Sequence, residues 1–274
     1  MREYHSRAGS LRSPLRSCVL ALVALALADT CLEAADWPMY RADAARTGYS
    51  PDPLPDHLEL RWIYRSRTGA APAWPTSSRI TFDFACQPII VGPLVIFGTS
   101  AEDKIIALDA DSGTVRWTFF TGGPVRFAPA AWRDRIFAAS DDDCLYALKG
   151  EDGTLLWKHR GGPNERMCMG NGRLISRWPA RGGPVVMENT VYYAAGIWPS
   201  DGVFLHALDA RTGEVLWTND RIGRMNMPQP HPGATADSGV APQGYLVATE
   251  SRLFVPTGRA VPAAFRRSDG HLEY

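Results

Sequence analysis

The sequence predicts an all-β protein built from four-stranded antiparallel β-propeller blades, and two recurring patterns carry this prediction. The first is an eleven-residue motif with a small residue at the start, Gly at the seventh position and an aromatic residue at the end. The second is a hairpin pattern about 20 residues before each motif, in which two runs rich in Val, Ile, Phe and Tyr flank a short turn. Each repeat therefore holds four strands. The motif reads "ALDADSGTVRW" at 107–117, "ALKGEDGTLLW" at 147–157, "ALDARTGEVLW" at 207–217 and "AFRRSDGHLEY" at 264–274.

The turn glycines set the period of the repeat. They recur every 40 to 60 residues, at 113, 153, 213 and 270, which is the spacing of propeller blades. A single blade cannot bury both of its faces, so neighbouring blades must stack, and a flat indole at one fixed place per blade supplies apolar area between them. We expect this structural packing role for Ala107, Gly113, Trp117, Ala147, Gly153, Trp157, Ala207, Gly213 and Trp217.

The first 35 residues have the composition of a Sec-type signal peptide. Four arginines precede the apolar run "CVLALVALALA" (18–28), and the small residues Ala34 and Ala35 follow it. The run is shorter than the roughly 20 residues that span a bilayer. Cleavage is therefore predicted over anchoring, with a lipid anchor on Cys31 as the disfavoured alternative. The mature chain would begin with an extended lead-in (36–56), followed by a repeat domain (57–274), in the periplasm or cell envelope and at most peripheral to a membrane.

Composition excludes some partners and constrains the cysteines. The formal net charge is zero and no cluster of Lys and Arg marks a nucleic-acid face, so nucleic acid is not an expected partner. Three cysteines, Cys86, Cys144 and Cys168, follow the predicted signal peptide. Because an odd number cannot pair completely, buried free thiols are the favoured interpretation over one disulfide with a leftover thiol. No His or Cys spacing is typical of a metal site.

The repeat resembles a known family. The pattern Ala-x-Asp-x-x-Thr-Gly-x-x-x-Trp is similar to the tryptophan-docking motif of the pyrroloquinoline quinone (PQQ)-type quinoprotein β-propellers. That superfamily contains quinone-dependent alcohol dehydrogenases and non-catalytic BamB-like outer-membrane assembly factors. The lead-in "DWPMYRADAARTGYSPDPLP" (36–55) and the following "LELRWIY" (58–64) also resemble the start of secreted BamB-like propellers. The resemblance covers residues 36–274 and implies a propeller fold more strongly than any one activity.

A lone strand precedes the first hairpin. Residues 59–65 carry Trp62 without a motif of their own, and they resemble a fourth strand that completes the last blade of a ring. The chain thus holds about four blades plus one orphan strand, whereas relatives of this kind close with seven or eight. We therefore expect the N-terminal part of a longer propeller, with self-association through its open end, over a closed four-bladed ring with a spare strand.

Two long segments between motifs, 160–184 and 221–244, are the expected places for ligand or partner contacts, because propellers bind through loops on a rigid scaffold. Both are rich in Gly, Pro, Met and Arg. Arginines beside indole faces suit an anionic or planar ligand, although the same arginines could instead pair with acidic side chains. The candidate ligand rim consists of Arg126, Arg177, Trp178, Arg181, Trp198 and His231.

No catalytic arrangement is visible in the sequence. A quinone-dependent dehydrogenase needs Ca²⁺ held by carboxylate and amide oxygens, an Asp base and a cavity for PQQ, and the vicinal Cys-Cys of many such enzymes is absent. The three Asp of "SDDDC" (140–144) are expected in a solvated turn. The sequence therefore predicts an exported, non-catalytic binding or scaffolding module of the BamB-like kind, with a protein partner or a small anionic or planar ligand. The alternative is a PQQ- and Ca²⁺-dependent oxidoreductase acting on an alcohol or a sugar.

Overall fold

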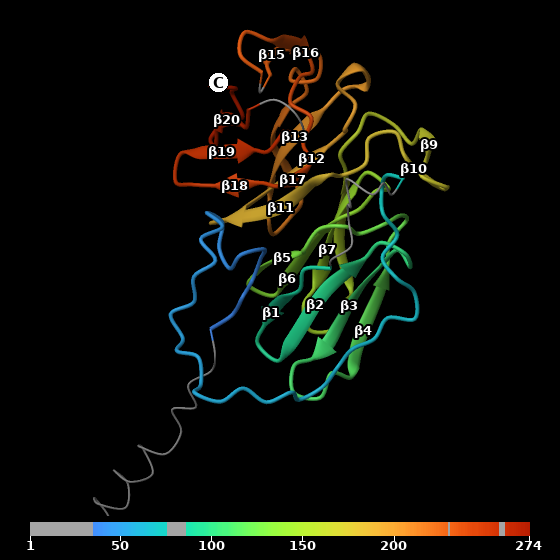
Figure 1. Ribbon diagram of the computed structural model, residues 1–274, viewed down its shortest axis with the longest axis vertical. Helices are drawn as coiled ribbons and strands as arrows, with labels where there is room; N and C mark the ends of the chain where they lie inside the picture. Colours follow the sequence, from blue (N-terminus) through green and yellow to red (C-terminus); the bar gives the residue numbers. More distant parts are fainter. Residues whose placement is uncertain (1–34, 76–85, 230, 258–260) are drawn as a thin grey trace, which may run out of the picture. The chain divides into compact units, whose positions relative to one another are not determined.

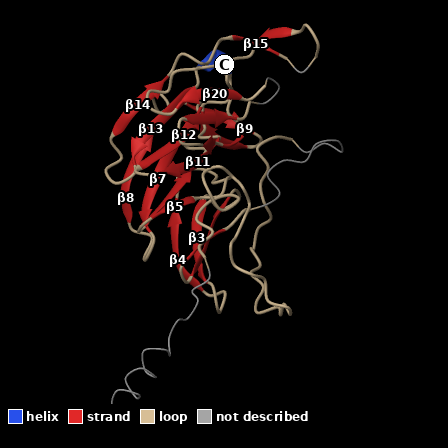
Figure 2. Cartoon of the chain, turned by 90° about the vertical axis from the view of Figure 1, so that its left-hand side faces the viewer, coloured by secondary structure: helices blue, strands red, loops and turns tan. Residues whose placement is uncertain are grey.

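The computed structural model describes residues 35–75, 86–229, 231–257 and 261–274. The signal peptide predicted for residues 1–35 lies, except for Ala35, outside the described residues. Residues 35–274 form one compact unit. In its described part the regular structure consists of strands, apart from one short 3₁₀ turn, η1 (Pro199–Asp201), as Figures 1 and 2 show.

Three complete blades follow one another along the described chain, and each contains four antiparallel strands that pair in sequence order. The predicted all-β class with four-stranded antiparallel blades is confirmed. Blade I contains β1 (Ile89–Val91), β2 (Leu94–Thr99), β3 (Lys104–Asp109) and β4 (Val115–Phe120); blade II contains β5 (Ala130–Trp132), β6 (Arg135–Ala139), β7 (Cys144–Lys149) and β8 (Leu155–Arg160); blade III contains β11 (Gly182–Met187), β12 (Thr190–Ala195), β13 (Phe204–Asp209) and β14 (Val215–Asn219).

Blade IV has three strands, β18 (Val247–Ala248), β19 (Arg252–Val255) and β20 (Ala263–Arg266). The last residues of the chain lie along β20: the Ala264 N–H donates to the Tyr274 carbonyl at 2.8 Å, and the Glu273 N–H donates to the Ala264 carbonyl at 2.8 Å. Residues 273 and 274 thus lie where the sequence predicts the fourth strand of blade IV. By contrast, residues 59–65 form no strand, which corrects the prediction of a lone strand there, because no described strand lies beside them to supply a ladder.

The turn between the third and fourth strands explains why the motif contains Asp and Gly. In blade I the Asp109 carboxylate accepts the N–H of Ser112 at 2.8 Å, and the Gly113 N–H donates to the Asp109 carbonyl at 2.8 Å. Gly113 has φ +69°, a conformation that costs glycine nothing. The hydrogen bond from the Ser112 backbone is the main reason that the pKa of Asp109 is lowered. Asp209 and Gly213 repeat this arrangement in blade III.

The lead-in runs along the first strand of every blade. Trp37 forms a bridge with Ile90 of β1, and the Pro38 carbonyl accepts the Ala131 N–H of β5 at 2.6 Å. Further on, the Ala44 carbonyl accepts the Ala248 N–H of β18 at 2.9 Å. The buried Arg46 donates Nη2 to the Pro184 carbonyl of β11 at 3.0 Å. Residues 37–46 therefore join four blades that are up to 200 positions away in the sequence.

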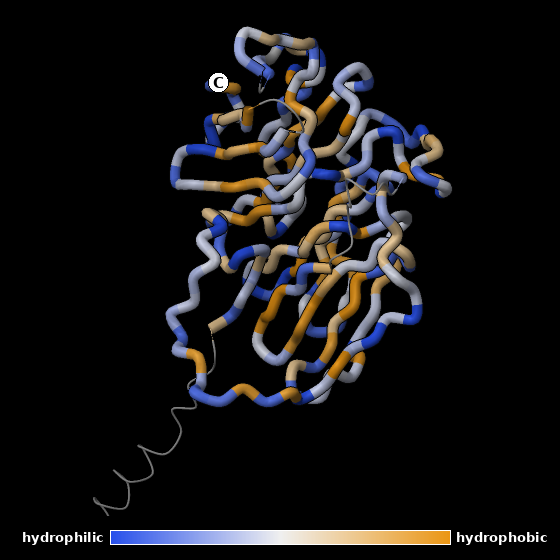
Figure 3. Tube along the Cα trace, in the orientation of Figure 1, coloured by the Kyte–Doolittle hydropathy of each residue, from blue (hydrophilic) through white to orange (hydrophobic). Residues whose placement is uncertain are grey.

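The core lies between the blades. One buried apolar cluster spans blades II, III and IV and includes Met39 of the lead-in, and a second spans blades I and II. In Figure 3 the apolar residues concentrate on the strands and the polar residues on the turns. This pattern is the one that stacked blades require, since each sheet must bury both of its faces.

The two long segments that separate the motifs contain short hairpins outside the blade plan. The first holds β9 (Met167–Gly170) and β10 (Arg173–Ser176), and the second holds β15 (Asn226–Pro228) and β16 (Thr235–Asp237). A further short strand, β17 (Gly244–Tyr245), pairs in parallel with β11. The expected loops are thus partly ordered as strands, which the mixed Gly, Pro and Met composition did not reveal.

Candidate functional site

Each docked tryptophan lies on the turn glycine of the next blade. Trp117 of β4 faces Gly153, where an added Cβ would lie 2.6 Å from the indole, and its Nε1 donates to the Gly150 carbonyl at 2.9 Å. Gly153 is therefore needed both for its φ of +73° and for the close approach of the ring. Ala147 is fully buried opposite Trp157, so its small side chain lets that indole reach Phe137, 5.6 Å away between ring centroids.

The same contact recurs at the other blades with one difference. Trp62 faces Gly113 and donates to the Ala110 carbonyl at 2.9 Å, and Trp217 donates to the Arg267 carbonyl at 3.0 Å. Trp157 faces Gly213, yet its buried Nε1 has no hydrogen-bond partner. The small motif residues Ala107, Ala147 and Ala207 lie directly across from Trp117, Trp157 and Trp217 in the strand ladders.

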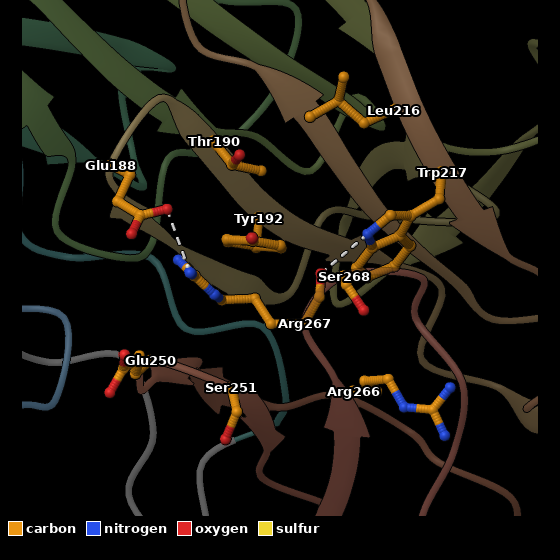
Figure 4. Close-up of a pocket in the computed structure, with 10 residues that line it drawn as sticks. All are labelled: Glu188, Thr190, Tyr192, Leu216, Trp217, Glu250, Ser251, Arg266, Arg267 and Ser268. Carbon is orange, nitrogen blue, oxygen red and sulfur yellow. Dashed lines mark hydrogen bonds and ion pairs between the residues drawn. The ribbon is translucent and has the colours of Figure 1, made fainter.

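A cavity of about 530 Å³ opens beside Trp217, between blades III and IV (Figure 4). Arg267 extends from the end of β20 across Tyr192, and its Nη2 donates to Glu188 Oε2 at 3.1 Å. Burial raises the pKa of Tyr192, which keeps its hydroxyl protonated at neutral pH. The lining combines charged and hydroxyl side chains with the rings of Tyr192 and Trp217. They are formed by Glu188, Thr190, Tyr192, Leu216, Trp217, Glu250, Ser251, Arg266, Arg267 and Ser268.

Two of the predicted rim arginines meet at a buried aspartate. Arg126 Nε lies 2.6 Å from Asp141 Oδ2, and Arg181 Nε lies 2.6 Å from Asp141 Oδ1. The side chains are 2%, 6% and 1% exposed for Arg126, Arg181 and Asp141, so this group is an internal ion cluster and not part of an exposed rim. The expectation of a solvated "SDDDC" turn is wrong, because Asp141 and Asp143 are both buried.

The remaining rim residues separate into two places. Arg177 and Trp198 line a second cavity of about 340 Å³ beside β9, where Arg177 Nη2 pairs with Asp201 Oδ1 at 2.5 Å. Trp178 is buried and donates Nε1 to the Asp201 carbonyl at 2.7 Å, at the end of η1. His231 lies elsewhere, exposed in the turn between β15 and β16. The cavity is lined by Arg166, Met167, Cys168, Met169, Arg177, Trp198, Ser200 and Asp201.

A group of buried polar side chains lies between blades II and III. Burial lowers the pKa of His206 to about 4, so its neutral ring donates Nε2–H to the Gly161 carbonyl and accepts from Thr218 at Nδ1, both at 2.9 Å. Burial also raises the pKa of Asp143 to about 8, although the Gly162 N–H donates to its Oδ1 at 2.7 Å. His159 Nδ1 lies 2.7 Å from the Tyr193 hydroxyl. The polar contacts of these groups therefore lie within the protein, between blades II and III.

The described residues do not fit a PQQ and Ca²⁺ site. The buried arginines that could bind carboxylates of the cofactor are bonded to Asp141. The buried Asp143 carboxyl accepts the Gly162 N–H at 2.7 Å and lies 3.7 Å from Arg160 Nη1, so it is also engaged within the protein. In residues 35–75, 86–229, 231–257 and 261–274, no group of three or more His, Cys, Asp or Glu side chains could hold a metal ion.

Comparisons with known proteins give a family match over part of the chain and one curated relative of low identity. Residues 90–202 match the family model described as outer membrane protein assembly factor BamB. The dehydrogenase subunit of a quinone alcohol dehydrogenase from Gluconobacter oxydans (strain 621H) is 25% identical over 229 residues, covering 77% of this chain and 28% of the relative.

Two solved structures share the fold. The quinohemoprotein alcohol dehydrogenase of Comamonas testosteroni superposes with a TM-score of 0.63 at 17% identity, covering 93% of this chain and 44% of that one. A quinohemoprotein alcohol dehydrogenase from Pseudomonas putida HK5 superposes with a TM-score of 0.62 at 15% identity, covering 87% and 39%. At this identity the superpositions establish the fold. The chain spans less than half the length of each of these relatives.

The blades and their docked tryptophans define the chain as a β-propeller repeat protein. Its repeats are similar to those of the BamB family model, which matches residues 90–202, and to the tryptophan-docking repeats that the sequence motif resembles. No helix among the described residues is long and apolar enough to cross a membrane.

Sequence reasoning missed three features: the course of the lead-in, the partners of Asp141 and the ordered hairpin at β9. For the hairpin a signal was present, because the pair Asn171-Gly172 between the two strands is typical of a two-residue hairpin turn, and both residues have positive φ.

Proposed function

We propose that the chain is an exported, non-catalytic binding or scaffolding module of the BamB-like kind, acting in cell-envelope protein assembly or ligand binding. The observation that carries this proposal is the β9–β10 hairpin with its 340 Å³ cavity. The hairpin forms a separate two-stranded sheet beside the blades and presents exposed apolar side chains, Met167, Met169 and Leu174. A feature of this kind suits a partner site.

The state of the titratable groups also supports a non-catalytic role. A general base needs a pKa near the working pH and access to a substrate. His206 is buried with both ring nitrogens hydrogen-bonded, and Asp141 accepts from two guanidinium groups. These side chains are therefore committed to interactions within the protein.

The second candidate function is a PQQ- and Ca²⁺-dependent oxidoreductase, favoured by the 25% identity to a quinone alcohol dehydrogenase subunit. Titration of the purified protein with PQQ in the presence and absence of Ca²⁺, followed by absorbance and thermal shift, separates the two. We expect no stoichiometric binding and no rise in melting temperature. Stoichiometric, Ca²⁺-dependent binding would overturn the non-catalytic proposal and direct the search to an alcohol or sugar substrate.

Export is part of the proposal and has its own test. The chain should be recovered from a periplasmic extract, beginning near Asp36 by N-terminal sequencing, if the Sec signal predicted for residues 1–35 is cleaved. Recovery of the uncleaved chain from the cytoplasm would exclude export. This outcome is independent of the PQQ titration.

A further inference from the structure

The β9–β10 hairpin has one free edge. Arg177 N–H donates to the Arg166 carbonyl at 2.9 Å, and the register pairs Cys168 with Ile175 and Met169 with Leu174. Hydrogen-bonded and non-hydrogen-bonded pairs alternate in an antiparallel ladder. Since residues 166 and 177 form a hydrogen-bonded pair, the N–H and C=O groups of Met167 and Met169 point away from β10.

Nothing in the described chain pairs with this edge. The hairpin is a two-stranded sheet in which β9 has β10 as its one neighbour. The opposite edge is attached to the body of the protein, because Ser176 N–H donates to the Asp141 carbonyl at 2.9 Å and Arg173 Nη1 donates to the Ser100 carbonyl at 2.6 Å. The outward backbone groups of Met167 and Met169 therefore offer two donors and two acceptors to an added strand.

The outer face of the hairpin is apolar. Met167, Met169 and Leu174 are 44%, 71% and 57% exposed, while Ile175 on the other face is 4% exposed. Met169 and Leu174 lie directly opposite each other in the ladder. Methionine side chains adapt to varied partners, and such residues are enriched where proteins meet.

The charge beside this edge is positive. Arg166 directly precedes β9 and its exposed side chain lines the cavity, where Arg177 is paired with Asp201. Two arginines against one aspartate leave one positive charge in the lining. An unpaired carboxylate on a partner would complement it.

We propose that β9 binds an extended segment of a partner protein by strand addition, and that this segment carries alternating apolar side chains and an acidic residue that pairs with Arg166. The backbone of Met167 and Met169 supplies the affinity, and the Met167–Met169–Leu174 face and Arg166 supply the selectivity. This inference rests on the proposed binding function, for which it names the surface and the partner chemistry.

A library of displayed heptapeptides, selected on the purified protein, tests the proposal. Enriched peptides should alternate apolar residues and contain Asp or Glu, and hydrogen exchange should show protection of the Met167 and Met169 amides in the complex. Met169→Pro removes one outward N–H without breaking a hairpin bond, so it should weaken binding by about tenfold or more. Arg166→Glu should reject the acidic peptides and accept their Lys-substituted versions, whereas Arg211→Glu, an exposed charge reversal on the turn before β14, should change nothing.

Three outcomes would overturn the proposal: no enriched peptide, equal binding by Met169→Pro while it retains the wild-type melting temperature, or protection at another site. A dimer that Met169→Pro dissociates would make a second copy of the chain the occupant and would equally overturn it. The PQQ titration decides the non-catalytic function separately. A failed selection without PQQ binding would thus overturn strand addition at β9, while the absence of PQQ binding would still support a non-catalytic function.

Discussion

Trp117 and Trp62 make the same contact from different settings. Each indole faces a turn glycine with positive φ and donates Nε1 to a backbone carbonyl at 2.9 Å. Trp117 belongs to the paired strand β4 and is 7% exposed. The segment around Trp62 forms no strand, and its Leu58, Leu60 and Ile63 are 77%, 79% and 60% exposed. Docking is therefore encoded by the receiving turn, whereas strand formation needs a neighbouring strand.

The largest expected effect on stability is at Trp117, the docked tryptophan that belongs to a paired strand. Trp117→Ala should lower the free energy of unfolding by about 3–5 kcal/mol, because it removes a buried aromatic side chain and leaves a cavity against Gly153. Urea denaturation followed by far-UV circular dichroism measures this loss. A change within about 0.5 kcal/mol, the range of a neutral surface substitution, would show that the indole does not hold blades I and II together.

The second effect is a pH dependence of stability that arises from Asp143, between blades II and III. The native state holds this proton up to a pKa of about 8 while the unfolded state releases it near 3.8, so stability should fall as pH rises between these values. His206, with its native pKa lowered to about 4, acts oppositely, costing stability as pH falls from 6.5 to 4. The Asp143 contribution therefore dominates above pH 6.5, because the opposing His206 contribution fades as the unfolded histidine loses its proton there.

Between pH 6.5 and 8, one proton at 1.36 kcal/mol per pH unit predicts a loss of about 2 kcal/mol for the wild type. Asp143→Asn should remove this slope, as measured by chemical denaturation at several pH values. Near Asp143 lie Asp142, Cys144, Arg160 and Tyr193. Asp134→Asn on the exposed turn before β6 is the matched control. Parallel pH profiles for wild type and Asp143→Asn would refute the assigned pKa.

The third effect on stability concerns Trp62, the docked tryptophan in the segment that forms no strand. Trp62→Ala should cost about 1 kcal/mol, because it breaks one hydrogen bond and one partly exposed contact while little else holds the segment. Hydrogen exchange of residues 58–65 should become rapid, with blade I unchanged. A cost equal to that of Trp117→Ala would instead show that docking alone supplies most of the packing energy.

These contacts also show what the sequence could reveal. The Gly and Trp positions were predictable because the motif is local: the Asp109 and Gly113 turn closes within five residues, and its spacing repeats. Asp141 was misplaced because its partners Arg126 and Arg181 lie 15 and 40 positions away, and a polar run looks alike in a solvated and a buried turn. The link from Arg46 to Leu246 spans 200 positions, beyond any local pattern.

The smallest effect separates the indole hydrogen bond from indole packing. Trp117→Phe removes the bond to the Gly150 carbonyl, whereas Trp157→Phe removes a buried Nε1 that has no partner. Both changes shrink the ring equally, so Trp117→Phe should cost about 1 kcal/mol more, the net value of one hydrogen bond. Denaturation midpoints at constant slope measure the difference, with Trp132→Phe on β5 as a control away from the docking turns. Equal costs would mean that ring shape alone holds the blades together and that the recurring bond to the carbonyl adds nothing.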